Sequence, residues 1–178
     1  MKFLKENKLA VLSIGVVVLI AVLLAIPGQF AHYALKDSNS YIHNLSGYQF
    51  FFNSYRNNLD KAIGNSVVGS GIALIVLAPF AIASICLGKK SSFFVLLASL
   101  FNLTMSILFF TMENASKKAY ASMPVYEGKA AIGWVAYVAG ALLMIVALYL
   151  GYKAVMMMKD EVKHPSTPKG PSYNYLKK

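Results

Sequence analysis

The chain has 178 residues and a mean hydropathy of +0.56, with 57% hydrophobic residues and only 13% charged ones. A soluble domain carries roughly 25% charged residues, and a disordered chain combines low hydrophobicity with high charge. The composition therefore excludes a disordered chain and argues against a water-soluble globule. The net charge of +10 does not predict a nucleic-acid partner, because the basic residues lie between apolar stretches and at the chain ends rather than on one surface.

Four long stretches of the chain carry no charge. Residues 9–35, 62–88, 91–112 and 130–152 contain no Asp, Glu, Lys or Arg, and each stretch is 22 to 27 residues long. A helix of about 20 apolar residues crosses a hydrocarbon core of roughly 30 Å. The sequence therefore predicts an all-α fold, an antiparallel four-helix transmembrane bundle in the plasma membrane.

The first stretch has a second interpretation, because the lysine-rich segment 1–8 followed by the apolar run 9–26 resembles a signal peptide. That run is 18 residues long, and the apolar core of a signal peptide is about 7–15 residues. We therefore interpret it as a retained span. Pro27 and Gly28 are expected to end the helix or to kink it.

The distribution of lysine and arginine predicts the orientation. If residues 1–8, 89–90 and 153–178 face the cytoplasm, they hold 11 Lys or Arg in 36 residues, whereas the outer loops 36–61 and 113–129 hold 6 in 43. Basic residues concentrate on the cytoplasmic side of membrane proteins, so both termini are predicted to be cytoplasmic. The proline-rich, basic end of the tail is predicted to be disordered.

Small and polar side chains recur at helical spacing inside three of the stretches. The candidates for helix packing are Ser66, Gly69, Ser70 and Ala73 in the second stretch, Asn102 and Ser106 with Ser99 in the third, and Ala136 and Gly140 in the fourth. Membrane helices associate through small residues and interhelical hydrogen bonds. We expect Asn102 to bond across the bundle, with the Ser66 and Ser70 face as its candidate partner. In the alternative, Pro79 and these polar residues line a path through a channel.

The first outer loop is rich in aromatic residues. It contains Tyr48, Phe50, Phe51 and Phe52, and in a strand Tyr48, Phe50 and Phe52 would share one face. Aromatic rings settle at the headgroup level of a membrane, so the loop is expected to form an aromatic belt or to cap the bundle. The alternative is a docking surface for a partner, since exposed aromatic patches bind other molecules.

Residues for chemistry are sparse. The sequence has no P-loop, GxSxG, HExxH or CxxC motif, and its single cysteine, Cys86, excludes an intramolecular disulfide. Histidine 32 is the only ionisable residue in the four stretches apart from tyrosine and Cys86, whereas proton relays place acids or bases within the membrane. The spacing of His32, Asp37 and His43 matches no established metal-ligand pattern. We therefore predict no enzyme, no cofactor and no metal.

The order of these features resembles a diffuse group of small four-span membrane proteins from low-GC Gram-positive and mycoplasma-like bacteria. The resemblance rests on residues 45–52, the Lys89–Lys90 turn, the glycine-rich entry of the second stretch and residues 131–133. It implies the four-span plan but no activity. The plan is also similar to that of the claudins, which generally staple their outer loops with cysteine pairs that this chain does not have.

Together these features predict a non-catalytic accessory or scaffold subunit of a membrane complex. Its expected partners are the lipid bilayer and a membrane protein or further copies of the chain, without nucleic acid. The alternative is a small transporter or channel subunit that acts as an oligomer. A third hypothesis is an enzyme that acts on lipid through His32.

Overall fold

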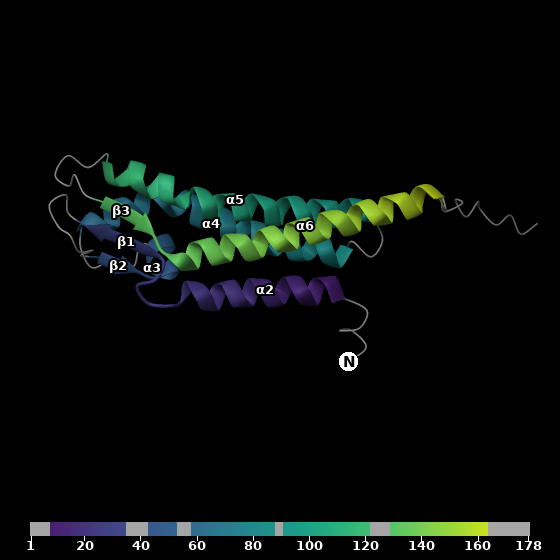
Figure 1. Cartoon of the computed structure of the whole chain (residues 1–178), viewed down its shortest axis with the longest axis horizontal. Coiled ribbons are helices and arrows are strands. Elements are labelled where there is room, and N and C mark those ends of the chain that lie inside the picture. Colours follow the sequence, from purple (N-terminus) through teal and green to yellow (C-terminus); the bar gives the residue numbers. More distant parts are fainter. Residues whose placement is uncertain (1–7, 35–42, 53–57, 88–90, 122–128, 164–178) are drawn as a thin grey trace, which may run out of the picture.

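The computed structural model describes residues 8–34, 43–52, 58–87, 91–121 and 129–163. Four long helices run side by side in alternating directions (Figure 1): α2 (Lys8–Leu24), α4 (Asn58–Leu87), α5 (Ser92–Ala121) and α6 (Trp134–Lys163). At one end of them lie the short helix α3 (Gly47–Phe52) and three strands, β1 (Ala31–Ala34), β2 (His43–Leu45) and β3 (Lys129–Ile132). The prediction of a mainly helical fold is confirmed. The strands are not expected from the sequence pattern.

The first helix is shorter than its predicted stretch. Helix α2 ends at Leu24, so only the first part of residues 9–35 is helical, and residues 31–34 form a strand instead. Proline disfavours helix in the residue before it, and Gly28 then takes a φ of +66° that turns the chain. Of the two expectations for Pro27 and Gly28, the end of the helix is therefore the correct one.

The three strands form one antiparallel sheet in the order β2-β1-β3. In the central strand His32 lies opposite Asn44 of β2 and opposite Ala131 of β3. The backbone N–H of Gly133 donates to the carbonyl of Phe30 at 2.7 Å and continues the pairing up to the start of α6. The sheet thus joins the connection after α2 to the connection before α6.

The aromatic segment of the first predicted outer loop is the helix α3, not a strand on which Tyr48, Phe50 and Phe52 would share one face. Its start carries a reciprocal cap, in which the amide of Gln49 donates to Ser46 Oγ at 3.3 Å and the amide of Ser46 donates to Gln49 Oε1 at 2.9 Å. Such a capping box satisfies two amides that a helix start otherwise leaves without partners. The helical turn directs both Phe50 and Phe51 inward, where a strand would have separated them.

An aromatic cluster fills the space between α3, the sheet and α5. The ring of Phe30 lies 5.1 Å from that of Phe50, 5.2 Å from that of Phe51 and 6.3 Å from that of Phe109. Phe30 and Phe50 are fully buried and Phe51 is 4% exposed. Phe50 and Phe51 therefore lie inside this end of the bundle and present almost no exposed surface. Tyr48 is 40% exposed, and the side chain of Phe52 lies outside the described part.

Helices α5 and α6 pack closely along a seam of small residues. Ser106 Oγ donates to the Gly140 carbonyl at 2.8 Å, and Ser99 Oγ donates to the Ala147 carbonyl at 2.7 Å. A Cβ atom added to Gly140 would lie 3.2 Å from the Cβ of Phe109, so glycine permits this approach. Ala136 is fully buried on the same helix.

The remaining packing candidates have other surroundings. Asn102 is buried, and the hydrogen bond of its Nδ2 goes to the Ala98 carbonyl of its own helix at 2.8 Å, not across the bundle. A side chain that reaches back four residues satisfies its donor locally. Ala73 is partly buried in α4. The burial and contacts of Ser66, Gly69 and Ser70, like the predicted disordered tail, lie outside the described part.

Two helices are long and apolar enough to cross a membrane by length and composition, at Ser92–Ala115 in α5 and Trp134–Val162 in α6. The apolar helical segments Lys8–Leu24 and Ile72–Cys86 are shorter within the described residues. These helices weakly suggest a membrane protein. The crossing by all four helices stays a prediction.

Candidate functional site

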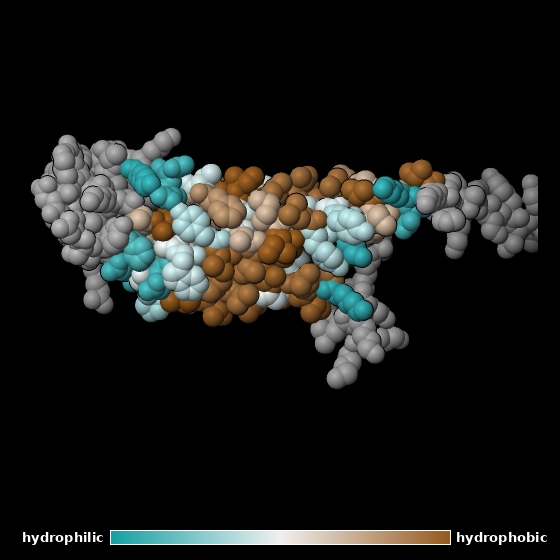
Figure 2. Space-filling view, viewed as in Figure 1, coloured by the Kyte–Doolittle hydropathy of each residue, from teal (hydrophilic) through white to brown (hydrophobic). Residues whose placement is uncertain are grey.

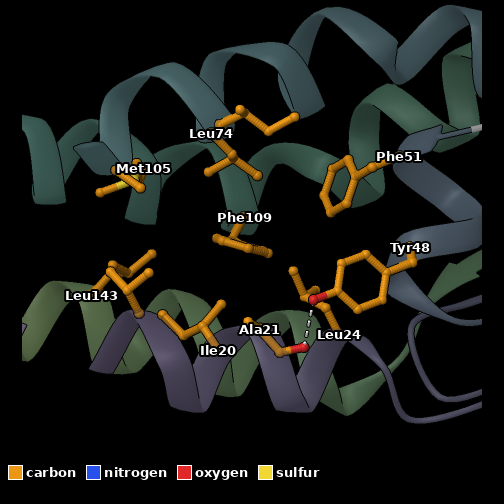
Figure 3. A pocket seen from close by; sticks show the side chains of 12 residues that line it. Ile20, Ala21, Leu24, Tyr48, Phe51, Leu74, Met105, Phe109 and Leu143 are labelled. Atoms are coloured by element: carbon orange, nitrogen blue, oxygen red, sulfur yellow. Dashed lines mark hydrogen bonds between the residues drawn. The ribbon is translucent and has the colours of Figure 1, made fainter. Parts of the chain in front are cut away.

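A cavity of about 170 Å³ lies where α2 faces α4, α5 and α6, with α3 at one end (Figure 3). Side chains from all five helices surround it. They are Val17, Ile20, Ala21, Leu24, Tyr48, Phe51, Leu74, Ile75, Ala78, Met105, Phe109 and Leu143. Tyr48 is the only member of this set with a polar side chain, so the cavity is apolar.

The cavity has buried walls on one side and exposed ones on the other. Met105, Phe109 and Leu143 are each 2 to 3% exposed, and they form the wall that α5 and α6 contribute. Ile75 of α4 is 51% exposed and Tyr48 of α3 is 40% exposed. The cavity therefore reaches from the core to the outer surface of the bundle.

Small residues leave the cavity unfilled. Ala21 lies on α2 and Ala78 on α4, and both line the space, at positions where larger side chains would project into it. Protein interiors are otherwise packed to a density near that of organic crystals. Larger residues at either position would be expected to reduce the volume.

Tyr48 closes one end of the cavity and ties α3 to α2. Its hydroxyl donates to the Ala21 carbonyl at 3.1 Å (Figure 3). The amide of Ala25, which would reach that carbonyl in a regular α-helix, donates instead to Val22 at 3.1 Å as the last turn of α2 tightens. The tyrosine hydroxyl thus supplies a donor to a carbonyl at the end of α2.

The residues considered for metal or catalytic chemistry do not gather at this cavity. His32 Nδ1 and Asn44 Oδ1 lie 2.7 Å apart in the sheet, Asp37 is outside the described residues, and so is the side chain of His43. Within the described ranges no group of three His, Cys, Asp or Glu could hold a metal ion.

Two of the cavity residues, Tyr48 and Phe51, are singled out by the sequence, as parts of an aromatic belt or cap or, in the alternative, of a partner surface. The other lining residues are ordinary apolar members of helices, and nothing in the helical periodicity distinguishes a residue beside a void from one in a filled core. The capping motif of Ser46 and Gln49 is the signal that could have placed α3 over the helix ends.

Comparison with known protein families and with curated proteins finds no match for this chain. The cavity, the buried seams and the exposed surface of the helices are therefore the observations on which a function can be proposed.

Proposed function

We propose that the chain crosses the membrane four times and serves as a non-catalytic accessory or scaffold subunit of a membrane complex. The observation that supports this best is a band of large apolar side chains exposed around the middle of the bundle, with polar residues at both ends (Figure 2). All four long helices contribute to it, for example through Val18, Phe80, Ile107 and Leu148, which are 49 to 66% exposed. Such a band suits contact with lipid.

Exposed aromatic residues on α6 bracket this band. Trp134 and Tyr137 are exposed near the sheet, and Tyr149 and Tyr152 are exposed toward the other end. Trp134 and Tyr152 are 18 residues apart, which is about 27 Å of helix. This separation agrees with a hydrocarbon core of roughly 30 Å flanked by two aromatic belts.

The pairing of α5 with α6 shows which residues of α5 lie level with the two aromatic belts. Ser106 pairs with Gly140, and Ser99, seven residues earlier, pairs with Ala147, seven residues later. Continuing this register places Met112 level with Trp134 and Phe94 level with Tyr152. Residues 94–112, which make up most of the charge-free stretch 91–112, therefore fall between the two aromatic belts.

The same geometry favours a packing role for the polar face over a path for solutes. Ser99 and Ser106 donate to backbone carbonyls of α6, and Asn102 donates within α5. Pro79 is on an exposed part of α4. Among the polar residues suggested for a channel, Ser99, Asn102 and Ser106 thus make helix contacts, and Pro79 lies apart from them on an exposed part of another helix.

The end of α6 that lies away from the sheet is a candidate surface for a partner. It continues for eleven residues past Tyr152 to Lys163, and there Val155, Met156 and Val162 are 47%, 41% and 81% exposed. By the lysine distribution this segment is cytoplasmic. Large apolar side chains that face water are typical of a site where another protein binds, and methionine adapts to varied partners.

Single-cysteine labelling tests the membrane topology. In a Cys86→Ala background, Asn114→Cys at the sheet end should react with an impermeant maleimide from outside intact cells, and Asp160→Cys only after permeabilisation. Ile145→Cys, in the middle of α6 and 64% exposed, should react only in detergent. Reaction of Asp160→Cys from outside, or of Ile145→Cys without detergent, would contradict the proposed crossing.

Purification from native membranes in several mild detergents tests the scaffold role. The tagged chain should bring down a membrane protein or further copies of itself, and Val162→Asp should reduce a contact made through the end of α6. Recovery of the isolated chain in every detergent would contradict the proposal.

A further inference from the structure

We propose that the cavity between α2 and the other helices binds the hydrocarbon tail of an outer-leaflet lipid. This inference rests on the proposed insertion into the membrane but not on the scaffold role. The site would hold the end of one acyl chain, which enters beside the exposed Ile75 and reaches the buried Met105 and Phe109.

The lining of the cavity selects for hydrocarbon. Apart from Tyr48, whose hydroxyl is hydrogen-bonded to Ala21, the side chains around it are aliphatic, thioether or phenyl groups. A water molecule needs two to four polar partners, and these walls do not supply them. Apolar cavities of about 150 Å³ stay dry and take up benzene, so about 170 Å³ suffices for a short segment of an acyl chain.

The position of the cavity identifies the lipid leaflet. Leu143 follows Trp134 by nine residues, so it lies about 13 Å along α6 from the belt at the sheet end. This is halfway to Tyr152, at the middle of the proposed hydrocarbon core. Tyr48 and Phe51 border the cavity near the sheet. The cavity therefore extends from the outer aromatic belt to the bilayer centre, the depth range of an outer-leaflet tail.

The opening of the cavity is continuous with the lipid-facing band. Ile75 lines the cavity and is 51% exposed, and its neighbour Val76 is 46% exposed on the same helix. A tail that moves from the band into the cavity exchanges one apolar environment for another and gains dispersion contacts with walls that otherwise face a void. No polar group has to lose water for this step.

Photo-crosslinking tests the proposal directly. The full chain is placed in nanodiscs of phosphatidylcholine that carries a diazirine at the end of one acyl chain, and labelled residues are mapped by mass spectrometry. We expect label on buried Met105 or Phe109 as well as on Ile107, which is 49% exposed on the same helix. Ala78→Leu should abolish label at Met105 and Phe109 and leave label at Ile107 unchanged.

A matched control and a second variant keep the result interpretable. Ala83→Leu adds the same volume to α4 at an exposed position, and its residues should be labelled in the same pattern as in the original chain. Ala21→Leu fills the cavity from the side of α2. It replaces Ala78→Leu as the filling variant if Ala78→Leu does not yield a monodisperse protein. The proposal is overturned if Met105 and Phe109 stay unlabelled while Ile107 is labelled, or if both filling variants keep their label. Absence of label at Ile107 as well would instead contradict membrane insertion.

Discussion

Gly133 occupies the tightest position at the junction of sheet and helix. A Cβ atom built there would lie 2.0 Å from the Gln29 carbonyl oxygen and 3.0 Å from His32 Nε2. Gly133→Ala should therefore separate β3 from β1 and destabilise the protein by about 1–3 kcal/mol, the range found for overpacked sites. Thermal unfolding in detergent micelles measures the change.

The matched control for this substitution is Gly15→Ala in α2. No atom lies within 4 Å of a Cβ added at Gly15, and alanine favours helix over glycine by about 0.5–1 kcal/mol. Gly15→Ala should leave the midpoint of thermal unfolding unchanged or raise it. Equal destabilisation by both substitutions would mean that the contact with Gln29 is not the cause.

At the same scale, the sequence predicts which residues share a helix face but not which atoms they meet. The sequence predicts both Ser106 and Gly140 at helix seams, and the Ser106 hydroxyl donates to the Gly140 carbonyl. The sequence predicts that Asn102 bonds across the bundle, yet its side-chain amide donates to the Ala98 carbonyl of its own helix. Helical spacing fixes the direction in which a side chain leaves its helix. Whether the side chain bonds to a local or a remote acceptor depends on its rotamer and on the distance between the helices.

At the scale of elements, α5 and α6 are joined by a cap that the sequence pattern does not reveal. The carboxylate of Glu161 accepts from the amide of Ser92 at 3.0 Å and from its hydroxyl at 2.8 Å. Amides at the start of a helix have no partners within it, and negative charge there is favourable. Glu161 lies in the predicted cytoplasmic tail, 69 residues along the chain from Ser92, so no local motif joins them.

Glu161→Gln should weaken this cap, because the amide side chain keeps only one acceptor oxygen and loses the charge. We expect the midpoint of thermal unfolding to fall by about 2–4 °C, the shift typical of a small loss of stability in a chain of this size. Asp160→Asn removes the same charge from the neighbouring exposed position and is the control. A fall of equal size in both variants would assign the effect to net charge rather than to the bond with Ser92.

The helix α3 is missing from the sequence prediction for a different physical reason. Alternation of Tyr48, Phe50 and Phe52 favours a strand when only spacing is considered, but the Ser46 and Gln49 capping box favours a helix. The helix prevails because it buries Phe50 and Phe51 together against Phe30. Burial of two phenyl rings outweighs the weak intrinsic preference of a six-residue segment.

At the scale of the whole molecule, the absence of charge predicts the long helices well and their connections poorly. The apolar stretches correspond to α2, α4, α5 and α6, although α5 and α6 continue past the stretches to Ala121 and Lys163. The sheet could not be predicted, because its strands are three or four residues long and the central strand β1 pairs with β3, which is distant in sequence. Length and hydropathy identify a helix, whereas strand pairing depends on how the helix ends are brought together.

The depth of α6 in the bilayer can be measured with its own fluorophore. Trp134 is the only tryptophan of the chain, it is 51% exposed, and its Nε1–H donates to Gln29 Oε1 at 3.0 Å. In vesicles with brominated lipids, bromine near the headgroup should quench its emission more strongly than bromine at the chain end. The expected depth is about 13 Å from the bilayer centre, half of the 18-residue separation from Tyr152.

Two variants in a Trp134→Phe background complete this measurement. Tyr152→Trp should give the same shallow depth as Trp134, since both lie in the proposed belts, and Ile145→Trp should be quenched most by bromine at the chain end. This pattern, shallow at both ends and deep between them, requires α6 to cross the bilayer. Equal depth for all three positions would mean that the helix lies flat on the membrane surface. Absence of quenching at all three would mean that the exposed apolar band does not contact lipid, which would contradict the proposed function.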